Sequence, residues 1–349
     1  MITRRIACID ARGVGVLTEE ELVAPPPGQV QVEVRASLIS PGTELGRVGA
    51  LRQVKDQAKD QKPRPFGYAN AGVVTQVGEG VSGVQLGDRV ACMGGGYALH
   101  ADAVHVPVNL TAPVPEGVDF ESAAFAHLAA TALHAMRRVA PLFGENGMVV
   151  GLGLVGQLTA QFGQLSGCHM MGVDRFTFRR DRALACGVEQ VAGAPEDDCI
   201  AHAAQVTGDY GMDFGVIAFG GDGTSAFEQI VSCLKQTPDT HRMGRIVIVG
   251  GARIEHGFAA ALGNVDVRSA ARTGPGYHDE AWEHGAGYPP VFVEWPTRRN
   301  LTECLRAIAD GRLHVAELIT HRFKLASIGD AVDELVERPQ QALGVVLTP

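Results

Sequence analysis

Hydrophobic and polar residues alternate in short segments through the amino-terminal part of the chain. Residues 29–38 alternate most cleanly, and a proline-rich stretch at 25–28 precedes them. The apolar members of this segment fall on one face: Val30, Val32, Val34, Ala36 and Leu38. Similar segments are 71–77, 89–92 and 98–106, with glycine turns between them. Because such alternation is typical of half-buried strands, this region is predicted to form a small barrel or sandwich.

The pattern becomes helical at 123–138, where no helix breaker occurs and Asp119 or Ser122 can cap the helix. Beyond it, apolar strand candidates alternate with helical spacing. They are 148–150, 169–173, 188–191, 214–218, 245–249 and 265–267. Since parallel neighbours need crossover connections, this alternation predicts an α/β fold with a doubly wound parallel sheet. The tail adds helical faces at 301–309 and 328–336 and a strand at 343–347.

The sharpest local signal is a glycine-rich turn between an apolar strand and a helix. Gly151, Gly153 and Gly156 form a GxGxxG pattern there. The first glycine permits the turn, the second lets the backbone approach a pyrophosphate, and the third lets the helix pack on the strand. Free N–H groups at the start of the helix favour the same anion. The turn therefore predicts a dinucleotide site.

An acidic residue, Asp174, ends the next strand. A carboxylate in this position can hydrogen-bond both ribose hydroxyls of an adenosine and would repel a 2′-phosphate. NAD is therefore the expected cofactor. Two alternatives stay open: Asp174 caps the following helix, or Arg175, Arg179 and Arg180 bind the phosphate of NADP.

Two later strands also end in glycines and fit the carboxyl edge of the sheet, where such cofactors lie. The predicted cofactor-binding residues are Gly151, Leu152, Gly153, Leu154, Val155, Gly156, Asp174, Arg175, Arg179, Thr131, Phe219, Gly220, Val249, Gly250 and Gly251.

Composition narrows the classes of function. The chain has 349 residues and a net charge of −9, which argues against a nucleic-acid partner. Its 44 glycines have no three-residue period, so a collagen-like chain is excluded. No run is long and apolar enough for a membrane span or a signal peptide. The 7 dispersed cysteines, without a CxxC pair, predict reduced thiols and a cytoplasmic protein.

Five segments follow one another in a specific order along the chain. They are GYANAGVVTQVG at 67–78, GDRV at 87–90, VPEGV at 114–118, the GxGxxG with Asp174, and GRLHVAELIT at 311–320. In this order they resemble the medium-chain dehydrogenase/reductase superfamily, the relatives of zinc alcohol dehydrogenases, over essentially the full length. The resemblance implies a GroES-like β-barrel catalytic domain built from residues 1–122 and 293–349. It also implies a Rossmann NAD-binding domain of residues 123–292.

The chain departs from that family at the zinc ligands. Pro41 stands where zinc-dependent members carry a cysteine, and Tyr68 stands where they carry a histidine. Of the three ligand positions, only the third, His127, still carries a residue that can bind zinc. A catalytic zinc normally takes three protein ligands, and the four-cysteine loop of structural zinc is also missing. The sequence therefore predicts a member that binds no metal.

Without a metal, a side chain or an ordered water must handle the substrate's hydroxyl proton. Tyr68, His127 and Glu44 are the catalytic candidates, the first two because the resemblance places them at former ligand positions. An imidazole titrates near neutrality, whereas a tyrosine needs a positive neighbour to act as a base. Structural roles stay open for all three: His127 bonded to a backbone carbonyl, Tyr68 stacked on the glycine turn, and Glu44 as a cap.

The predicted substrate contacts are Ser40, Thr43, Arg272, Tyr277 and His278. The last three lie in a stretch rich in aromatic residues and arginine, which suits a polyhydroxylated or anionic substrate. The same composition also marks oligomer contacts, so both interpretations stay open.

These observations predict a cytoplasmic, zinc-independent NAD(H)-dependent oxidoreductase acting on a small molecule. It interconverts a secondary alcohol and a ketone of a sugar-like or polyol-like compound, as a homodimer or homotetramer without nucleic-acid or membrane partners. The alternatives are an NADPH-dependent quinone or enoyl reductase, an NAD-assisted elimination, and a nucleotide-binding sensor without catalysis.

Overall fold

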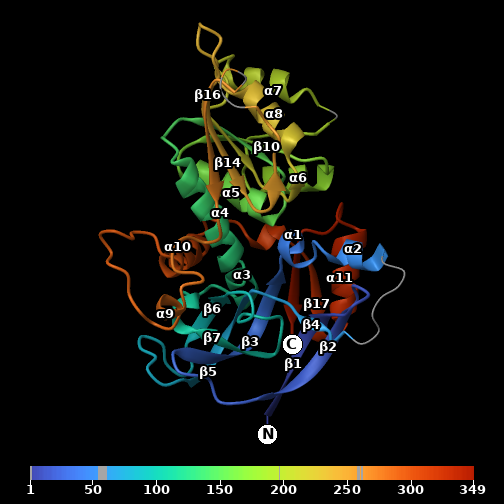
Figure 1. Ribbon diagram of the computed structural model, residues 1–349, viewed down its shortest axis with the longest axis vertical. Coiled ribbons are helices and arrows are strands. Elements are labelled where there is room, and N and C mark those ends of the chain that lie inside the picture. Colours follow the sequence, from blue (N-terminus) through green and yellow to red (C-terminus); the bar gives the residue numbers. More distant parts are fainter. Residues whose placement is uncertain (1, 54–60, 196, 258–259, 261) are drawn as a thin grey trace. The chain divides into compact units, whose positions relative to one another are not determined.

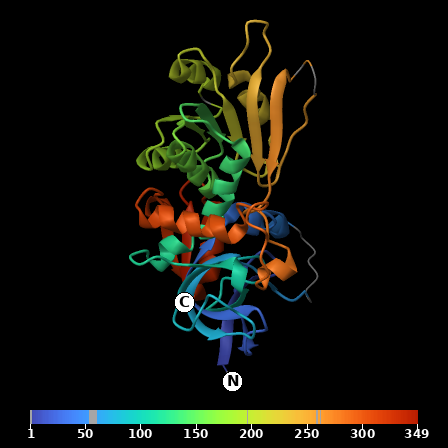
Figure 2. The same ribbon diagram turned by 90° about the vertical axis from the view of Figure 1, so that its left-hand side faces the viewer.

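The computed structural model describes residues 2–53, 61–195, 197–257, 260 and 262–349. The chain divides into two compact units: unit 1 comprises Met1–Ala130 and Thr273–Pro349, and unit 2 comprises Thr131–Arg272. Unit 1 is therefore built from both ends of the chain, and the blue and red ribbons of Figures 1 and 2 meet within it.

Unit 1 is dominated by antiparallel strands. Its strands are β1 (Ile2–Ile9), β2 (Gly15–Leu22), β3 (Gln29–Ile39), β4 (Arg64–Pro65), β5 (Ala69–Val77), β6 (Arg89–Met93), β7 (Ala103–Pro107), β8 (Thr111–Pro113), β17 (Ile319–Lys324) and β18 (Gly344–Thr348). The larger sheet has the order β17-β18-β3-β5-β6-β8, with β7 also paired to β3, and β2-β1-β4 form a second sheet. The alternation in 29–38 buries Val30, Val32 and Val34 as predicted, so β3 lies at the centre of the core.

Short helices cover these sheets. They are α1 (Pro41–Glu44), α2 (Val48–Gln53), η1 (Val108–Leu110), α3 (Phe120–Ala123), α9 (Glu280–Glu283), α10 (Thr297–Ala309), η3 (Ala316–Leu318), η4 (Leu325–Ser327) and α11 (Ile328–Glu337). Ile328, Val332 and Leu335 form the buried face of α11 and join a cluster with Ile39 and Val345 of the sheet. Helix α4 (Ala126–Val139) begins in unit 1 and continues into unit 2.

Unit 2 contains a parallel sheet in the order β11-β10-β9-β12-β14-β16. The strands are β9 (Asn146–Val150), β10 (His169–Val173), β11 (Gln190–Ala192), β12 (Phe214–Ile217), β14 (Met243–Val249) and β16 (Asn264–Ala270), with a small pair of β13 (Gly221–Asp222) and β15 (Ala252–Arg253). The helices α5 (Leu154–Leu165), α6 (Thr177–Ala185), α7 (Cys199–Thr207) and α8 (Thr224–Cys233) pack around it (Figure 1). The strand order runs outward in both directions from β9, so the predicted doubly wound α/β fold is confirmed.

Several elements differ from the sequence prediction. The segment predicted as a strand at 98–106 is a strand only from Ala103, because 94–99 close a turn in which Ala98 N donates to Gly94 O at 2.9 Å. Strands β1, β2 and β17 were not predicted, since charged residues interrupt their alternation. All seven cysteines are buried. Within the described ranges, no helix is long and apolar enough to cross a membrane.

The predicted domain boundaries lie at 122 and 292, whereas the two units divide after Ala130 and after Arg272. Residues 273–292 belong to unit 1, because Asn109 Nδ2 donates to Trp282 O at 2.5 Å and to Ala286 O at 3.1 Å. The start of α4 also belongs to unit 1, where His127 Nδ1 lies 2.8 Å from Tyr68 O. These hydrogen bonds join residues far apart in the chain, which explains the shift of both boundaries.

Candidate functional site

The glycine-rich turn of unit 2 has the conformation that its sequence predicts. Gly151 adopts φ +94°, which favours glycine, and a Cβ on Gly156 would overlap the carbonyl oxygen of Gly151. Gly153 precedes the first turn of α5 as its N-cap, and a Cβ there would meet no heavy atom within 4 Å. The first and third glycines are therefore required by the fold, whereas the second opens onto unfilled space.

The predicted cofactor residues that follow the strands lie at the same edge of the sheet. β9, β10, β12 and β14 are parallel neighbours that end at Val150, Val173, Ile217 and Val249. A Cβ on Gly220 or Gly251 would also meet no heavy atom within 4 Å, while the ring of Phe219 packs beside Gly151. Open backbone at the carboxyl ends of adjacent parallel strands is the setting in which a dinucleotide binds.

Asp174 links the glycine turn to the following loop. Its Oδ2 accepts a hydrogen bond from Leu152 N at 2.8 Å, and its Oδ1 accepts one from Phe176 N at 2.8 Å. The side chain is 4% exposed, so both bonds are shielded from water. A carboxylate has about four acceptor sites, and ribose hydroxyls can use those that remain. The N-cap of α6 is Phe176, and no side chain caps this helix, so the alternative in which Asp174 caps the following helix is wrong.

Arginines surround this carboxylate. Arg179 Nη1 lies 3.6 Å from Asp174 Oδ2, and Arg180 Nη1 donates to Asp174 O at 2.7 Å. The guanidinium groups of Arg175 and Arg179 lie 4.6 and 4.9 Å from the centroid of the Phe176 ring. Arg179 offsets part of the negative charge of Asp174 that would repel a 2′-phosphate. The charges around Asp174 are therefore compatible with either NAD or NADP.

The catalytic candidates come together in unit 1. His127, on α4, is 7% exposed, and its Nδ1 lies 2.8 Å from Tyr68 O. A carbonyl only accepts hydrogen bonds, so Nδ1 carries the proton and Nε2 is the acceptor nitrogen of this tautomer. Burial lowers the pKa of His127 to about 4, although the bond to Tyr68 O opposes the shift. His127 is therefore a neutral imidazole at pH 7.

This shift predicts that the free energy of unfolding depends on pH. Between about pH 6.5 and pH 4 the unfolded chain takes up a proton at residue 127, whereas the folded chain resists it. The contribution of His127 to the free energy of unfolding is therefore fully present above the pKa of the unfolded chain. It falls by about 3 kcal/mol as the pH drops towards the pKa of His127 in the folded chain. Denaturant unfolding at several pH values measures this. The variant His127→Asn, which keeps a donor but does not titrate, is expected to lose less stability over this range, and equal slopes would contradict the prediction.

Tyr68 is held as a protonated phenol. Burial raises its pKa well above the usual range, and the carboxylate of Glu44 raises it further, while hydroxyl groups of Ser40 and Thr43 hydrogen-bond to the phenol and oppose this effect. The rings of Tyr68 and His127 are 4.4 Å apart between centroids. The positive neighbour that a tyrosine base requires is not among these groups, so the arrangement suits a hydrogen-bond or proton donor better than a base.

Tyr277 and His278 extend this group of residues. The rings of His127 and Tyr277 lie 6.4 Å apart, and Tyr277 stacks on His278 at 4.0 Å. Gly95 N donates to Tyr277 Oη at 2.7 Å, which fixes the phenol against the turn at 94–99. Ser40, Thr43, Glu44, Tyr68, His127, Tyr277 and His278 therefore share unit 1, and Thr131 and Arg272 belong to unit 2.

Glu44 has a partner that sequence reasoning missed. Its Oε2 accepts from Ser40 N at 2.5 Å, and its Oε1 lies 3.2 Å from Nε2 of the fully buried His100. His100 stands in a segment predicted to be a strand, and no local signal distinguishes it there. Within the described ranges, no group of three histidine, cysteine or acidic side chains is arranged to hold a metal ion.

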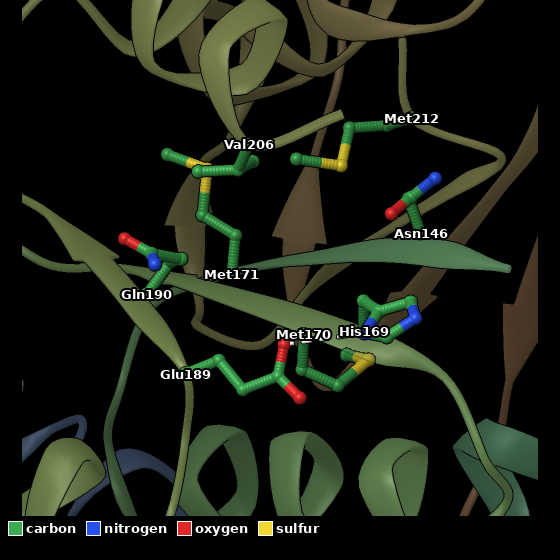
Figure 3. Close-up of a pocket in the computed structure, with 8 residues that line it drawn as sticks. All are labelled: Asn146, His169, Met170, Met171, Glu189, Gln190, Val206 and Met212. Carbon is green, nitrogen blue, oxygen red and sulfur yellow. Dashed lines mark hydrogen bonds and ion pairs between the residues drawn. The ribbon is translucent and has the colours of Figure 1, made fainter. Parts of the chain in front are cut away.

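A separate pocket of about 200 Å³ lies at the opposite edge of the sheet in unit 2 (Figure 3). Its lining includes Asn146, His169 and Gln190, the first residues of β9, β10 and β11. His169 and Glu189 at its rim are more than half exposed. Because dinucleotides bind at carboxyl ends of parallel strands, this pocket at the amino ends is not the predicted cofactor site.

Comparisons with known proteins agree with these features. Residues 26–116 match the family model of the alcohol dehydrogenase GroES-like domain. A 2-dehydro-3-deoxy-L-galactonate 5-dehydrogenase of Pseudoalteromonas atlantica is 26% identical over 262 residues, which cover 67% of this chain and 72% of that protein. A quinone oxidoreductase of Rattus norvegicus is 29% identical over 261 residues, covering 71% and 73%.

A similar fold occurs in a solved structure of a Sinorhizobium meliloti 1021 protein bound to NADP. It superposes with a TM-score of 0.77 and 17% identity, over 100% of both chains. At this identity the likeness concerns the fold. The order of motifs, the matched domain and the relatives all agree with the resemblance found in the sequence.

Proposed function

The protein belongs to the medium-chain dehydrogenase/reductase superfamily, and from this premise we propose that it is an NAD(H)-dependent oxidoreductase that interconverts a secondary alcohol and a ketone without zinc. The observation that carries the proposal is the pairing of His127 with Tyr68. A neutral imidazole and a protonated phenol lie side by side where the resemblance places metal ligands of the zinc enzymes.

Unit 2 supplies the cofactor site. The open backbone at Gly153, Gly220 and Gly251 can approach a pyrophosphate, and Asp174 can accept hydrogen bonds from a ribose. Bound nicotinamide supplies the capacity to accept or donate a hydride. The oxidoreductase chemistry is thus the cofactor's, and this chain provides binding and proton handling.

Unit 1 supplies the proton chemistry. In the oxidation direction, Nε2 of His127 accepts the hydroxyl proton, because Nδ1–H is engaged with Tyr68 O. In the reduction direction, the Tyr68 phenol donates a hydrogen bond to the carbonyl oxygen as negative charge develops on it, and the protonated Nε2 of His127 returns the proton to that oxygen. Burial and the carboxylate of Glu44 keep the phenol protonated, and the hydroxyl groups of Ser40 and Thr43 orient it.

Zinc independence is testable by metal analysis. Pro41 has no ligand atom, and the Tyr68 phenol resists ionisation, so the conversion of an alcohol to a ketone must proceed without a zinc-bound alkoxide. We expect far less than one zinc per purified chain and unchanged turnover after treatment with EDTA. Near-stoichiometric zinc that resists chelation would contradict this part of the proposal.

The substrate class rests on the group of hydroxyl and aromatic side chains in unit 1. Hydroxyl and aromatic groups suit a hydroxylated substrate, and the relative from Pseudoalteromonas atlantica is named for a sugar-derived substrate. A second candidate is an NADPH-dependent quinone reductase. The relative from Rattus norvegicus and the ion pair of Arg179 with Asp174 favour it.

Asp174 distinguishes these candidates. Titration of the wild-type protein is expected to give at least about tenfold tighter binding of NADH than of NADPH, because the carboxylate repels the 2′-phosphate. Asp174→Asn is expected to remove most of this preference. Asp222→Asn, on the exposed strand β13, serves as the matched control. Tighter binding of NADPH by the wild type would instead favour the quinone reductase.

A further inference from the structure

A buried chain of polar groups lies beside the catalytic candidates of unit 1. Ser37 Oγ is 3.0 Å from Nδ1 of His100, and Nε2 of His100 is 3.2 Å from Oε1 of Glu44. His100 is 0% exposed, and the Glu44 side chain is 3% exposed. None of these groups belongs to the dinucleotide site, and the proposed chemistry does not yet use His100 or Ser37.

The backbone holds His100 firmly in place. Its N–H donates to Phe66 O at 3.1 Å, and its carbonyl accepts from Ala7 N at 2.8 Å. The Phe66 ring meets the imidazole edge-on at 4.9 Å. Gly67 approaches so closely that a Cβ there would overlap His100 N. The imidazole therefore has a fixed position next to the residue that precedes Tyr68.

Glu44 needs this neighbour. A carboxylate removed from water is costly unless it is paired and hydrogen-bonded. Oε2 is satisfied by Ser40 N, but Oε1 has no hydrogen bond of good geometry, and neither has Nε2 of His100. The two atoms are close enough for a small adjustment to align them. Among the ion pairs of the described residues, His100 is the basic partner of Glu44.

We propose that His100 is a positioning residue for the reaction. Ser37 donates its hydroxyl proton to Nδ1, which leaves the imidazole with a proton on Nε2 that points at Glu44. This contact holds the carboxylate against the Ser40–Glu44 turn, whose hydroxyl groups orient the phenol of Tyr68. The inference rests on the proposed function, because it assigns His100 to the placement of the proposed proton donor.

The tautomer provides a direct test on the full-length protein. Histidine NMR with ¹⁵N labels, with His100 assigned through the variant His100→Gln, is expected to show the proton on Nε2. A proton on Nδ1 would mean that His100 donates to Ser37 and not to Glu44. That result would overturn the inference whether or not the protein turns over a substrate.

Kinetics separates positioning from a merely structural role. His100→Leu is expected to lower kcat at least tenfold while the KM for the cofactor stays within twofold, because unit 2 binds the cofactor. His100→Gln, which can still donate to Glu44, is expected to restore most of the lost kcat. The matched control is His105→Leu, since His105 is a half-buried histidine of the same unit that bonds weakly to Gln31 at 3.4 Å.

Ser37→Ala covers the case in which His100→Leu does not fold, and is expected to give a smaller fall in kcat. Wild-type kcat in both His100→Leu and Ser37→Ala would overturn the inference and leave the proposed function intact. A wild-type protein without turnover on a panel of secondary alcohols and ketones would instead overturn the proposed function, and the role of His100 with it.

Discussion

Replacing Gly153 by valine is expected to weaken NADH binding by at least about 100-fold without unfolding the protein. The backbone of Gly153 has φ −67°, which any residue adopts, and a Cβ there meets no heavy atom within 4 Å. The substitution therefore costs the free protein little. It fills the space at the start of α5 into which a pyrophosphate must come. Fluorescence titration with NADH, together with thermal unfolding, measures both quantities.

Gly156→Ala is the matched control at the third glycine of the same motif. A Cβ at this position overlaps the carbonyl oxygen of Gly151. The overlap can be relieved only if the backbone moves, which is more costly than the rotation of a flexible side chain. We expect this smaller substitution to lower the melting temperature as well as NADH binding. Retention of NADH affinity within threefold in Gly153→Val would show that the nucleotide does not use the GxGxxG turn.

The second large effect is expected for His127→Asn. The amide can replace Nδ1–H as the donor to Tyr68 O, but it removes the imidazole nitrogen that accepts the proton. Turnover in the oxidation direction is therefore expected to fall by about 10²–10⁴-fold, the usual contribution of general base catalysis. The affinity for NADH is expected to stay unchanged, because its binding residues lie in unit 2.

The pH dependence adds a second criterion. Since His127 has a pKa of about 4, oxidation by the wild type is expected to persist across neutral pH and to be lost as pH falls towards 4. The residual activity of His127→Asn is expected to lack this acid limb. His134→Asn, on the same helix but outside the group around Tyr68, is the control. Full turnover in His127→Asn would assign the base to another group.

The nucleotide site could be predicted from sequence because its determinants are local. A GxGxxG turn, the strand before it and the acid at the next strand end lie within a short stretch, and each fits a known backbone geometry. The parallel sheet followed from apolar runs of the right length. The hydrophobic pattern does not predict strands β1 and β2, because they form a half-exposed hairpin in which Arg4 pairs with Glu20. Their charged residues interrupt the alternation of apolar and polar positions.

The group around Tyr68 could be predicted only in part. The comparison with zinc ligand positions pointed to Tyr68 and His127, but nothing in the sequence indicated that His100 would face Glu44. That contact depends on the turn at 94–99, because of which the strand starts later than predicted, and on the closeness of Gly67. The difference between the predicted boundary at 292 and the return of the chain to unit 1 at Thr273 has the same origin, because Asn109 holds that segment through long-range bonds.

The position of β18 has a consequence for the order of assembly on the ribosome. This last strand of the chain is not at an edge: it lies between β17 and β3, with Leu347 paired to Ser37. Unit 2 is contiguous in sequence and can fold while the carboxyl-terminal residues of unit 1 are still being made. The Ser37 end of β3 stays an open strand edge until β18 emerges. A nascent chain thus completes its nucleotide turn well before the strand that carries Ser37, and with it the support of His100, is enclosed.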